Sequence, residues 1–214
     1  MAEKREIRSL IKNLLPAIDK VNKYHPSVID RAIERVLIEM YQELFAVDVH
    51  ALLRFTKGYG YNIPIAVNLR TSTGTYYSTL PAKIISFRDK ASGVRRISSP
   101  ISTGFTFVPV DAREVDLLMG GSNTNTVTSK VGYLVTHTEV EYYKRPTGLS
   151  WVKMDLIIPF SQYEETDTVL IPESTPGRQE ATFIERVLAI LGVIQPKDQK
   201  DDNADKVRQI NNKQ

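Results

Sequence analysis

The longest regular pattern of apolar residues in the chain lies between Val28 and Phe45. Apolar side chains recur there at spacings of three and four, the period of one helical face, at Ile29, Ile33, Val36, Leu37, Met40, Tyr41 and Leu44. Polar residues fill the other face except at Ile38, which we expect either to be partly covered by an earlier helix or to face a neighbouring chain. The pattern predicts a long amphipathic helix with Ser27 in the N-cap position.

Shorter helices are predicted on either side of this one. A helical stripe near the start of the chain consists of Ile7, Leu10, Ile11, Leu14 and Leu15, and Pro16 is expected to kink or break it. Asp48 is predicted to cap a short helix that runs through Leu53. A final helix is predicted from Phe183 to Leu191, closed by Gly192. We expect the N-terminal and C-terminal helices to pack together.

The region from residue 55 to residue 172 has a different pattern, in which short segments of β-branched and aromatic residues are separated by turn-forming residues. The predicted strands cover residues 63–69, 75–80, 82–87, 94–98, 105–110, 131–143, 149–160 and 168–171. We expect 82–87 to form a hairpin with 94–98. A second hairpin is expected between 131–143 and 149–160, whose alternating residues predict one apolar face.

The order of these elements predicts an α+β fold, because strands do not alternate with helices as a parallel doubly wound sheet requires. The expected parts are an N-terminal helical part of a small bundle at 1–54, a mainly antiparallel β region at 55–172 with a short helix at 113–119 capped by Asp111, a C-terminal bundle helix at 173–194, and a tail at 195–214. The tail and the loop 120–129 have few apolar residues to bury. We expect the loop to be mobile, and the tail to be disordered in the isolated chain or ordered only against a partner.

Composition excludes several classes of protein. The 214 residues include no cysteine and three histidines, which excludes disulfide scaffolds, thiolate zinc sites and cysteine nucleophiles. The longest apolar run, Val187 to Ile194, is too short to span a bilayer, and the charged N-terminus lacks the apolar core of a signal peptide. We therefore expect an intracellular chain. The net charge of +3 comes from interleaved acids and bases, so charge alone names no partner.

No catalytic, metal or cofactor site is predicted, and we expect no enzyme. The glycines of Lys57–Tyr61 lack the third glycine of a dinucleotide fingerprint and are interpreted as a flexible turn. Ser150 lacks the surroundings of a hydrolase nucleophile. Carboxylates that could act as acids and bases or hold Mg²⁺ are Glu139, Glu141, Glu164, Glu165 and Asp167, but such groups are common on exposed strands and loops.

Basic residues gather at two predicted hairpin tips. The candidate contacts with DNA or a partner are Arg88, Lys90, Arg95, Arg96, Lys144 and Arg145. Basic tips can contact phosphates without reading sequence, or meet acidic patches on another chain. The chain has no recognition helix, RNP motif or zinc finger, so sequence-specific binding is not predicted.

The order of several segments resembles a known family. The segments are IDRAIERVLIEMYQELF, TYYSTLPAKIISFR with GVRRIS, FTFVPVDAREVDLLMGG, VGYLVTHTEVEYYKR with LSWVKMDLIIPF, and DTVLIPESTPGRQEATFIERVLAILGVIQPKD. Together they resemble the head-to-tail adaptor or ring (connector) proteins of short-tailed bacteriophages, most closely the ring proteins of crAss-like phages. The resemblance spans most of the chain, but it consists of packing patterns and contains no diagnostic functional residue.

This resemblance implies a virion structural protein of the tail or neck region, made in the host cytoplasm. Roughly a dozen copies would form a ring that binds the portal protein and further tail or ring proteins. DNA would pass through its channel without sequence recognition, and neither a cofactor nor a membrane is implied. The candidate portal-binding residues of the tail are Lys197, Lys200, Lys206, Val207, Arg208 and Ile210.

Two other functions stay open at this point. One is a non-specific nucleic-acid-binding accessory protein, whose free monomer would have a salt-sensitive affinity for duplex DNA. The other is a small carboxylate-based hydrolase, in which Glu139, Glu141 or Glu164 would line a concave pocket.

Overall fold

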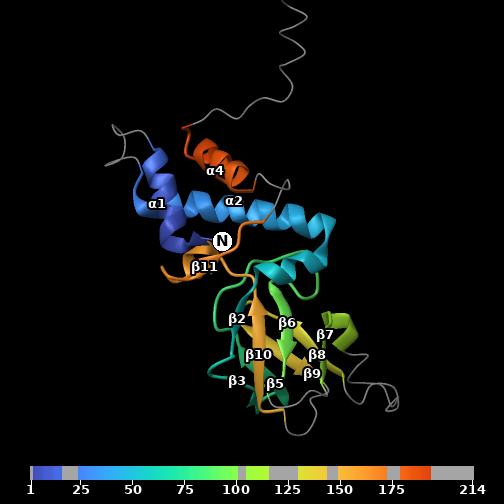
Figure 1. Ribbon diagram of the computed structural model, residues 1–214. Helices are drawn as coiled ribbons and strands as arrows, with labels where there is room; N and C mark the ends of the chain where they lie inside the picture. Colours follow the sequence, from blue (N-terminus) through green and yellow to red (C-terminus); the bar gives the residue numbers. More distant parts are fainter. Residues whose placement is uncertain are drawn as a thin grey trace, which may run out of the picture.

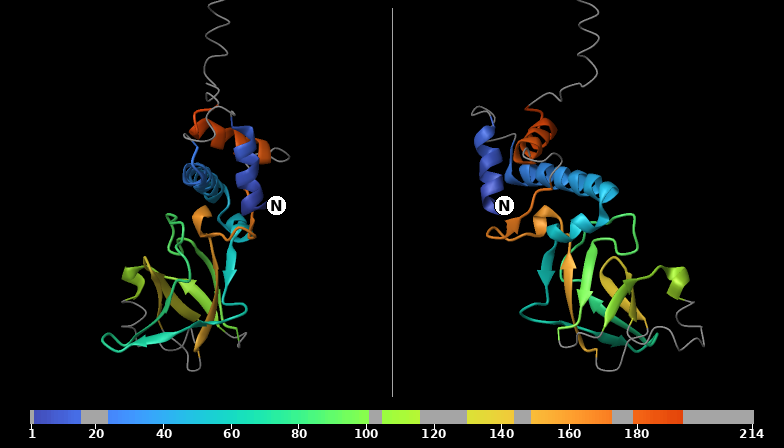
Figure 2. Two further views of the ribbon diagram at one scale, coloured as in Figure 1. Left: turned by 90° about the vertical axis from the view of Figure 1, so that its left-hand side faces the viewer. Right: turned by 45° about the vertical axis from the view of Figure 1, so that its right-hand side comes forward.

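The computed structural model describes residues 2–15, 24–100, 105–115, 130–143, 149–172 and 179–193. It has an α+β fold, as predicted, with a helical part stacked on a β part (Figure 1). The same stacking is visible from the two further directions of Figure 2. The helical part contains β1 (Ala2–Glu3), α1 (Lys4–Leu14), α2 (Pro26–Val47), the 3-10 helix η2 (Val49–Phe55), the 3-10 turn η3 (Phe160–Gln162), β11 (Thr168–Val169) and α4 (Gln179–Ile190).

The helix α2 is the centre of the helical part. Its predicted stripe is buried except at Leu44, which is partly buried. The helices α1 and α4 pack against α2 and against each other, which confirms the expected packing of the first and last helices. The predicted N-cap was wrong by two residues. The imidazole of His25 accepts a hydrogen bond from the backbone N–H of Ser27 at 3.3 Å, and Pro26 takes the first helical position, where its missing N–H costs nothing.

The β part consists of two sheets. In the first, the central strand β10 (Trp151–Leu156) pairs with β2 (Lys57–Tyr59), β3 (Ile65–Ala66) and β6 (Val94–Ser98). The second has the order β4 (Asn68–Arg70), β5 (Thr75–Thr79), β9 (Glu139–Tyr143), β8 (Lys130–Val135) and β7 (Thr106–Pro109). All described pairings are antiparallel except that of β7 with β8.

Both predicted hairpins were wrong. The segment 131–143 is itself the hairpin, with β8 and β9 joined at Thr136, whose N–H and hydroxyl both bond to the carbonyl oxygen of Glu139. The strand β10 therefore lies in a different sheet from β9. Residues 82–87 form no strand, because β6, their predicted partner, pairs with β10 instead. The N–H of Ile85 donates a backbone hydrogen bond to the carbonyl oxygen of Ile157 at 2.9 Å.

Local predictions around the turns were more accurate. Asp48 caps η2 by accepting the N–H of His50, and Asp111 accepts the N–H groups of Arg113 and Glu114 at the start of a helical turn at 112–115. The flexible turn expected at 57–61 is instead the strand β2. The turn comes only at Gly60, whose φ of +80° and closeness to a neighbouring carbonyl exclude a side chain.

Candidate functional site

Two of the contacts that attach the β part to the helical part involve cations, and the first of these cations is a predicted contact residue. Arg95 extends from β6 to lie against Phe45 of α2 and Phe87, with its guanidinium carbon 5.5 and 4.6 Å from the two ring centroids. Its Nη1 lies 2.7 Å from Asp89 Oδ2, and only 4% of its side chain is exposed. Arg95 is therefore an interior residue, and its assignment as an exposed contact with DNA or a partner was wrong.

The other basic residues of this loop remain at the surface. Arg88 and Arg96 are exposed. Lys90 is also exposed, but its ammonium bonds to Glu114 and lies 3.6 Å from Asp111. The hydrogen bond to Glu114 raises the pKa of Lys90, with the nearby carboxylate charges adding to it. The predicted contacts Lys144 and Arg145, the loop 120–129 and every predicted residue of the tail lie outside the described residues.

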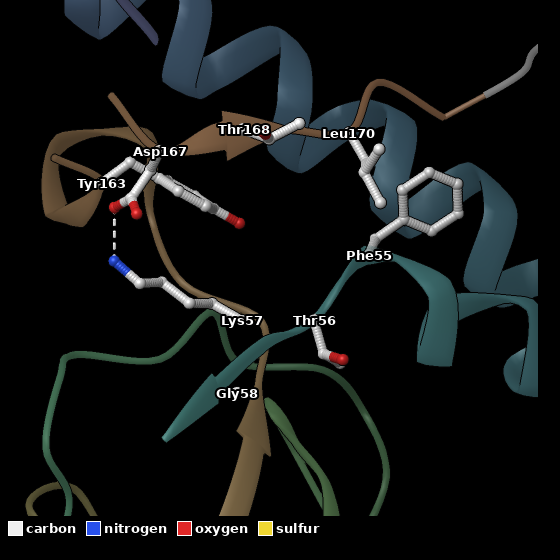
Figure 3. A pocket seen from close by; sticks show the side chains of 8 residues that line it. All are labelled: Phe55, Thr56, Lys57, Gly58, Tyr163, Asp167, Thr168 and Leu170. Carbon is white, nitrogen blue, oxygen red and sulfur yellow. Dashed lines mark hydrogen bonds and ion pairs between the residues drawn. The ribbon is translucent and has the colours of Figure 1, made fainter. Parts of the chain in front are cut away.

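The second attachment is a pocket of about 240 Å³ between the two parts (Figure 3). Lys57, at the start of β2, reaches across it to form an ion pair with Asp167, which precedes β11. The same carboxylate oxygen of Asp167 accepts the backbone N–H of Glu164 at 2.6 Å. Above it, the backbone N–H of Lys4 donates to the carbonyl oxygen of Asp167 at 3.0 Å, which ties the pocket to α1.

Electrostatics explain the state of the two acidic groups in this pocket. Burial alone would raise the pKa of Asp167, but hydrogen bonds from Lys57 and from the backbone of Glu164 outweigh it, so the pKa lies below its ordinary value. Burial, with the charge of Asp167 adding to it, raises the pKa of Tyr163 to about 12. Asp167 is therefore ionised and Tyr163 protonated at neutral pH.

This pocket is suited to joining the two parts of the molecule. Its single ammonium, that of Lys57, is neutralised by Asp167 and also lies 5.7 Å from the ring centroid of Tyr163. The remaining lining residues are Phe55, Thr56, Gly58, Thr168 and Leu170. None of the eight lining residues forms a nucleophile–base pair, and the ion pair of Lys57 with Asp167 links β2 to the segment that precedes β11.

The paired carboxylates that the sequence singled out are also engaged. Arg70 of β4 bonds to both Glu139 and Glu141 of β9, with the second contact at 2.7 Å. The hydroxyl of Tyr143 donates to the other oxygen of Glu141 at 2.7 Å. Glu139 and Glu141 share a face, as predicted, and both pair with Arg70. Glu164 is exposed.

The described residues contain neither of two other kinds of site. No group of three or more histidine, aspartate and glutamate residues there is arranged to hold a metal ion. No helix in that part of the chain is long and apolar enough to cross a membrane.

Among the described residues, the exposed apolar side chains include two groups that the sequence analysis missed. The first, here called the corner patch, consists of Val47, Val49 and Leu53 where α2 turns into η2, and Val47 is 87% exposed. The second, called the Trp151 patch, consists of Trp151 on β10 and of Tyr61 and Ile63 in the loop between β2 and β3, two of the strands that pair with β10. Ile63 is 85% exposed. In Figure 1 the end of α2 lies within the helical part, whereas β10 begins at the end of the β part that is farthest from the helices.

The residues of the Trp151 patch come from one strand and one neighbouring loop. Trp151 and Asp155 share a face of β10, and the hydroxyl of Tyr61 donates to Asp155 Oδ1 at 2.8 Å. Lys153, on the same face, lies over the Tyr61 ring at 5.1 Å. These contacts hold the Tyr61 side chain against β10. The alternation in β10 could have revealed this patch, because it places Trp151 opposite the buried Val152.

Comparison with known proteins adds no relative. No family model matches the chain, and no curated protein is found similar to it. The surfaces described above and the resemblance of the sequence segments are therefore the features that bear on function.

Proposed function

We propose that this chain is a structural subunit that assembles with copies of itself into a closed ring, and that the ring is a head-to-tail adaptor of a short-tailed bacteriophage. The observation that carries the proposal is the presence of two different exposed apolar patches, the corner patch and the Trp151 patch, at separate places on the molecule.

Symmetry makes two different patches informative. A two-fold dimer uses one self-complementary surface twice, whereas a head-to-tail contact joins two unlike surfaces and closes into a ring when the rotation allows. Exposed apolar groups of this kind mark interaction sites, and tryptophan and tyrosine are enriched in such interfaces. The corner patch of one copy would meet the Trp151 patch of the next.

The setting in a virion is supported by the resemblance of the sequence segments. In that setting the ring has roughly a dozen copies, binds the portal protein through its tail, and lets DNA pass through its channel. Of the predicted contact residues that the structure describes, Arg95 lies in the interior and Lys90 is paired with Glu114, which leaves the exposed Arg88 and Arg96 as the candidates for contact with DNA phosphates.

The assembly is tested with one charge placed in each patch. Val47→Asp and Ile63→Asp each remove one side of the proposed contact at positions that are more than four-fifths exposed, so the fold is expected to survive. Both variants should fail to form rings in native mass spectrometry. Gln42→Asp and Ser86→Asp, at other exposed positions, are matched controls and should assemble normally. Unchanged assembly in both patch variants would refute the proposed contact.

Mixing the two patch variants sharpens this test. The Ile63→Asp chain keeps an intact corner patch, and the Val47→Asp chain keeps an intact Trp151 patch. An equimolar mixture should therefore form a dimer of one chain of each kind and go no further. Restoration of full rings in the mixture would contradict a head-to-tail contact between these two patches.

The contact with DNA has a separate test. Reversing Arg88 and Arg96 to glutamate should leave ring formation intact and reduce retention of packaged DNA in assembled particles. Arg95 is left unchanged because its charge belongs to the interior. Unchanged retention of DNA would show that Arg88 and Arg96 do not contact the DNA in the channel.

A further inference from the structure

A groove in the helical part has no role in the proposed ring contact. It encloses about 340 Å³ between α1, the chain after β11, and α4, and its lining residues are Ala2, Glu6, Ile7, Leu10, Ile11, Ile171 and Phe183. Glu6 is the only charged residue in this lining. On α1 the apolar surface continues along Leu10 and Leu14, which are 38% and 47% exposed. We refer to this surface as the α1 groove.

We propose that the α1 groove is the docking site of this chain's own C-terminal segment, residues 204–210, in the isolated subunit. This inference does not depend on the proposed ring, because it concerns a single chain. The segment would cover apolar surface of the α1 groove that the packing of the helices leaves exposed.

The length and starting point of the chain make this docking feasible. The last described residue, Val193, follows α4, and the carbonyl oxygen of Leu191 accepts the hydroxyl of Tyr24 at 3.5 Å. Figures 1 and 2 show this end of α4 beside the C-terminal end of α1. The distance along α1 from Leu14 back to Glu6 is about 12 Å. The ten residues 194–203 can span up to about 34 Å, which is more than enough.

The chemistry of the segment matches that of the groove. Its apolar residues Ala204, Val207 and Ile210 recur every three positions, so one face of the segment can cover the leucines of α1. Within the segment, Lys206 and Arg208 lie beside the apolar residues and provide two positive charges against the one negative charge of Asp205. They complement Glu6, the single charge of the groove. Docking within one chain also benefits from a high effective concentration, which lets a small contact area suffice.

Hydrogen exchange of α1 tests this docking in the full-length chain. Val207→Asp with Ile210→Asp should make the amides of residues 4–14 exchange about tenfold faster, which corresponds to about 1.4 kcal/mol of docking free energy. The matched control is Gln209→Asp with Asn212→Asp, which adds the same charge to polar positions and should leave exchange nearly unchanged. Equal exchange in the two variants and the wild type would overturn the proposal.

A disulfide between introduced cysteines tests the contact directly, because the natural chain contains no cysteine. Leu10→Cys with Ile210→Cys should cross-link under mild oxidation and stay at the mass of one chain. The control pair, Lys83→Cys with Ile210→Cys, should not cross-link, because Lys83 is exposed in the β part. A cross-linked dimer in place of the monomer would show that a second copy occupies the groove, and no cross-link would show that the segment does not reach it. Either result would overturn docking within one chain.

Discussion

The two attachments between the helical and β parts use the same kind of charge pair in different surroundings. In the first, Arg95 lies against two phenyl rings with only 4% of its side chain exposed, paired with Asp89. In the second, Lys57 reaches Asp167 across an open pocket and keeps 23% of its side chain exposed. One cation is part of the core, and the other stays in contact with water.

The chemistry of the two cations explains this difference. A guanidinium is planar and weakly hydrated, so it can stack on Phe45 and Phe87 while a carboxylate satisfies its edge. An ammonium is strongly hydrated and is costly to enclose, which suits Lys57 to the rim of a pocket. Removing the partner carboxylate should therefore lower the free energy of unfolding more at Arg95 than at Lys57, and least at a pair on the surface.

The largest effect is expected for Asp89→Ala. This change leaves the buried guanidinium of Arg95 without its carboxylate, and we expect a loss of about 3 kcal/mol in the free energy of unfolding. This loss is at the low end of the usual range for breaking a buried ion pair, because a quarter of the Asp89 side chain is exposed. Urea denaturation followed by circular dichroism measures the change.

A double variant is the control for this prediction. Combining Asp89→Ala with Arg95→Met removes the stranded charge but keeps an unbranched apolar side chain beside the rings. It should recover a substantial part of the lost stability. If the double variant is less stable than Asp89→Ala alone, the uncompensated charge is not the cause of the loss.

A smaller effect is expected for Asp167→Asn. The amide keeps the shape of the side chain but loses the charge that holds Lys57 and the N–H of Glu164, so we expect a loss of about 1.5 kcal/mol at pH 7. Chemical denaturation measures it in the same way as for Asp89→Ala. A loss as large as that of Asp89→Ala would remove the distinction between the two attachments.

The same carboxylate gives a pH dependence of known sign. The pKa of Asp167 is lower in the folded chain than its ordinary value, so its contribution to stability is complete above that ordinary value and is lost as the pH falls through the folded pKa. The difference in the free energy of unfolding between the wild type and Asp167→Asn should therefore disappear as the pH falls below about 4. A constant difference in the free energy of unfolding from pH 7 to pH 2 would contradict this assignment.

The smallest effect is expected for Lys90→Ala. Its contacts with Glu114 and Asp111 are on the surface, where water and salt screen the charges. We expect no measurable change in the denaturation midpoint, with or without added salt. A clear loss of stability would show that this loop depends on its surface pair as well as on Arg95.

Sequence reasoning predicted the helices better than the partners of the strands. The stripe from Ile29 to Leu44 could be assigned because helical hydrogen bonds are local and the buried face recurs at a fixed period. The alternation in β10 correctly identified Val152, Met154 and Leu156 as buried. It could not identify the neighbours of β10, because strand pairing depends on distant segments.

The same limit applies to the candidate site. Arg95 and Arg96 are adjacent and identical in type, and nothing in the sequence distinguishes them except that neighbouring residues of a strand face opposite sides. That rule could have signalled that one of them points inward. The contact of Arg95 with Phe45 could not be predicted, since it depends on how α2 lies over β6.

The mass of the full-length chain in solution tests the central claim most directly. Native mass spectrometry at micromolar concentration should show one closed ring of roughly a dozen subunits, and Val47→Asp and Ile63→Asp should each abolish it while Gln42→Asp does not. A species with the mass of a single chain at every concentration, for the wild type as for the variants, would contradict the account.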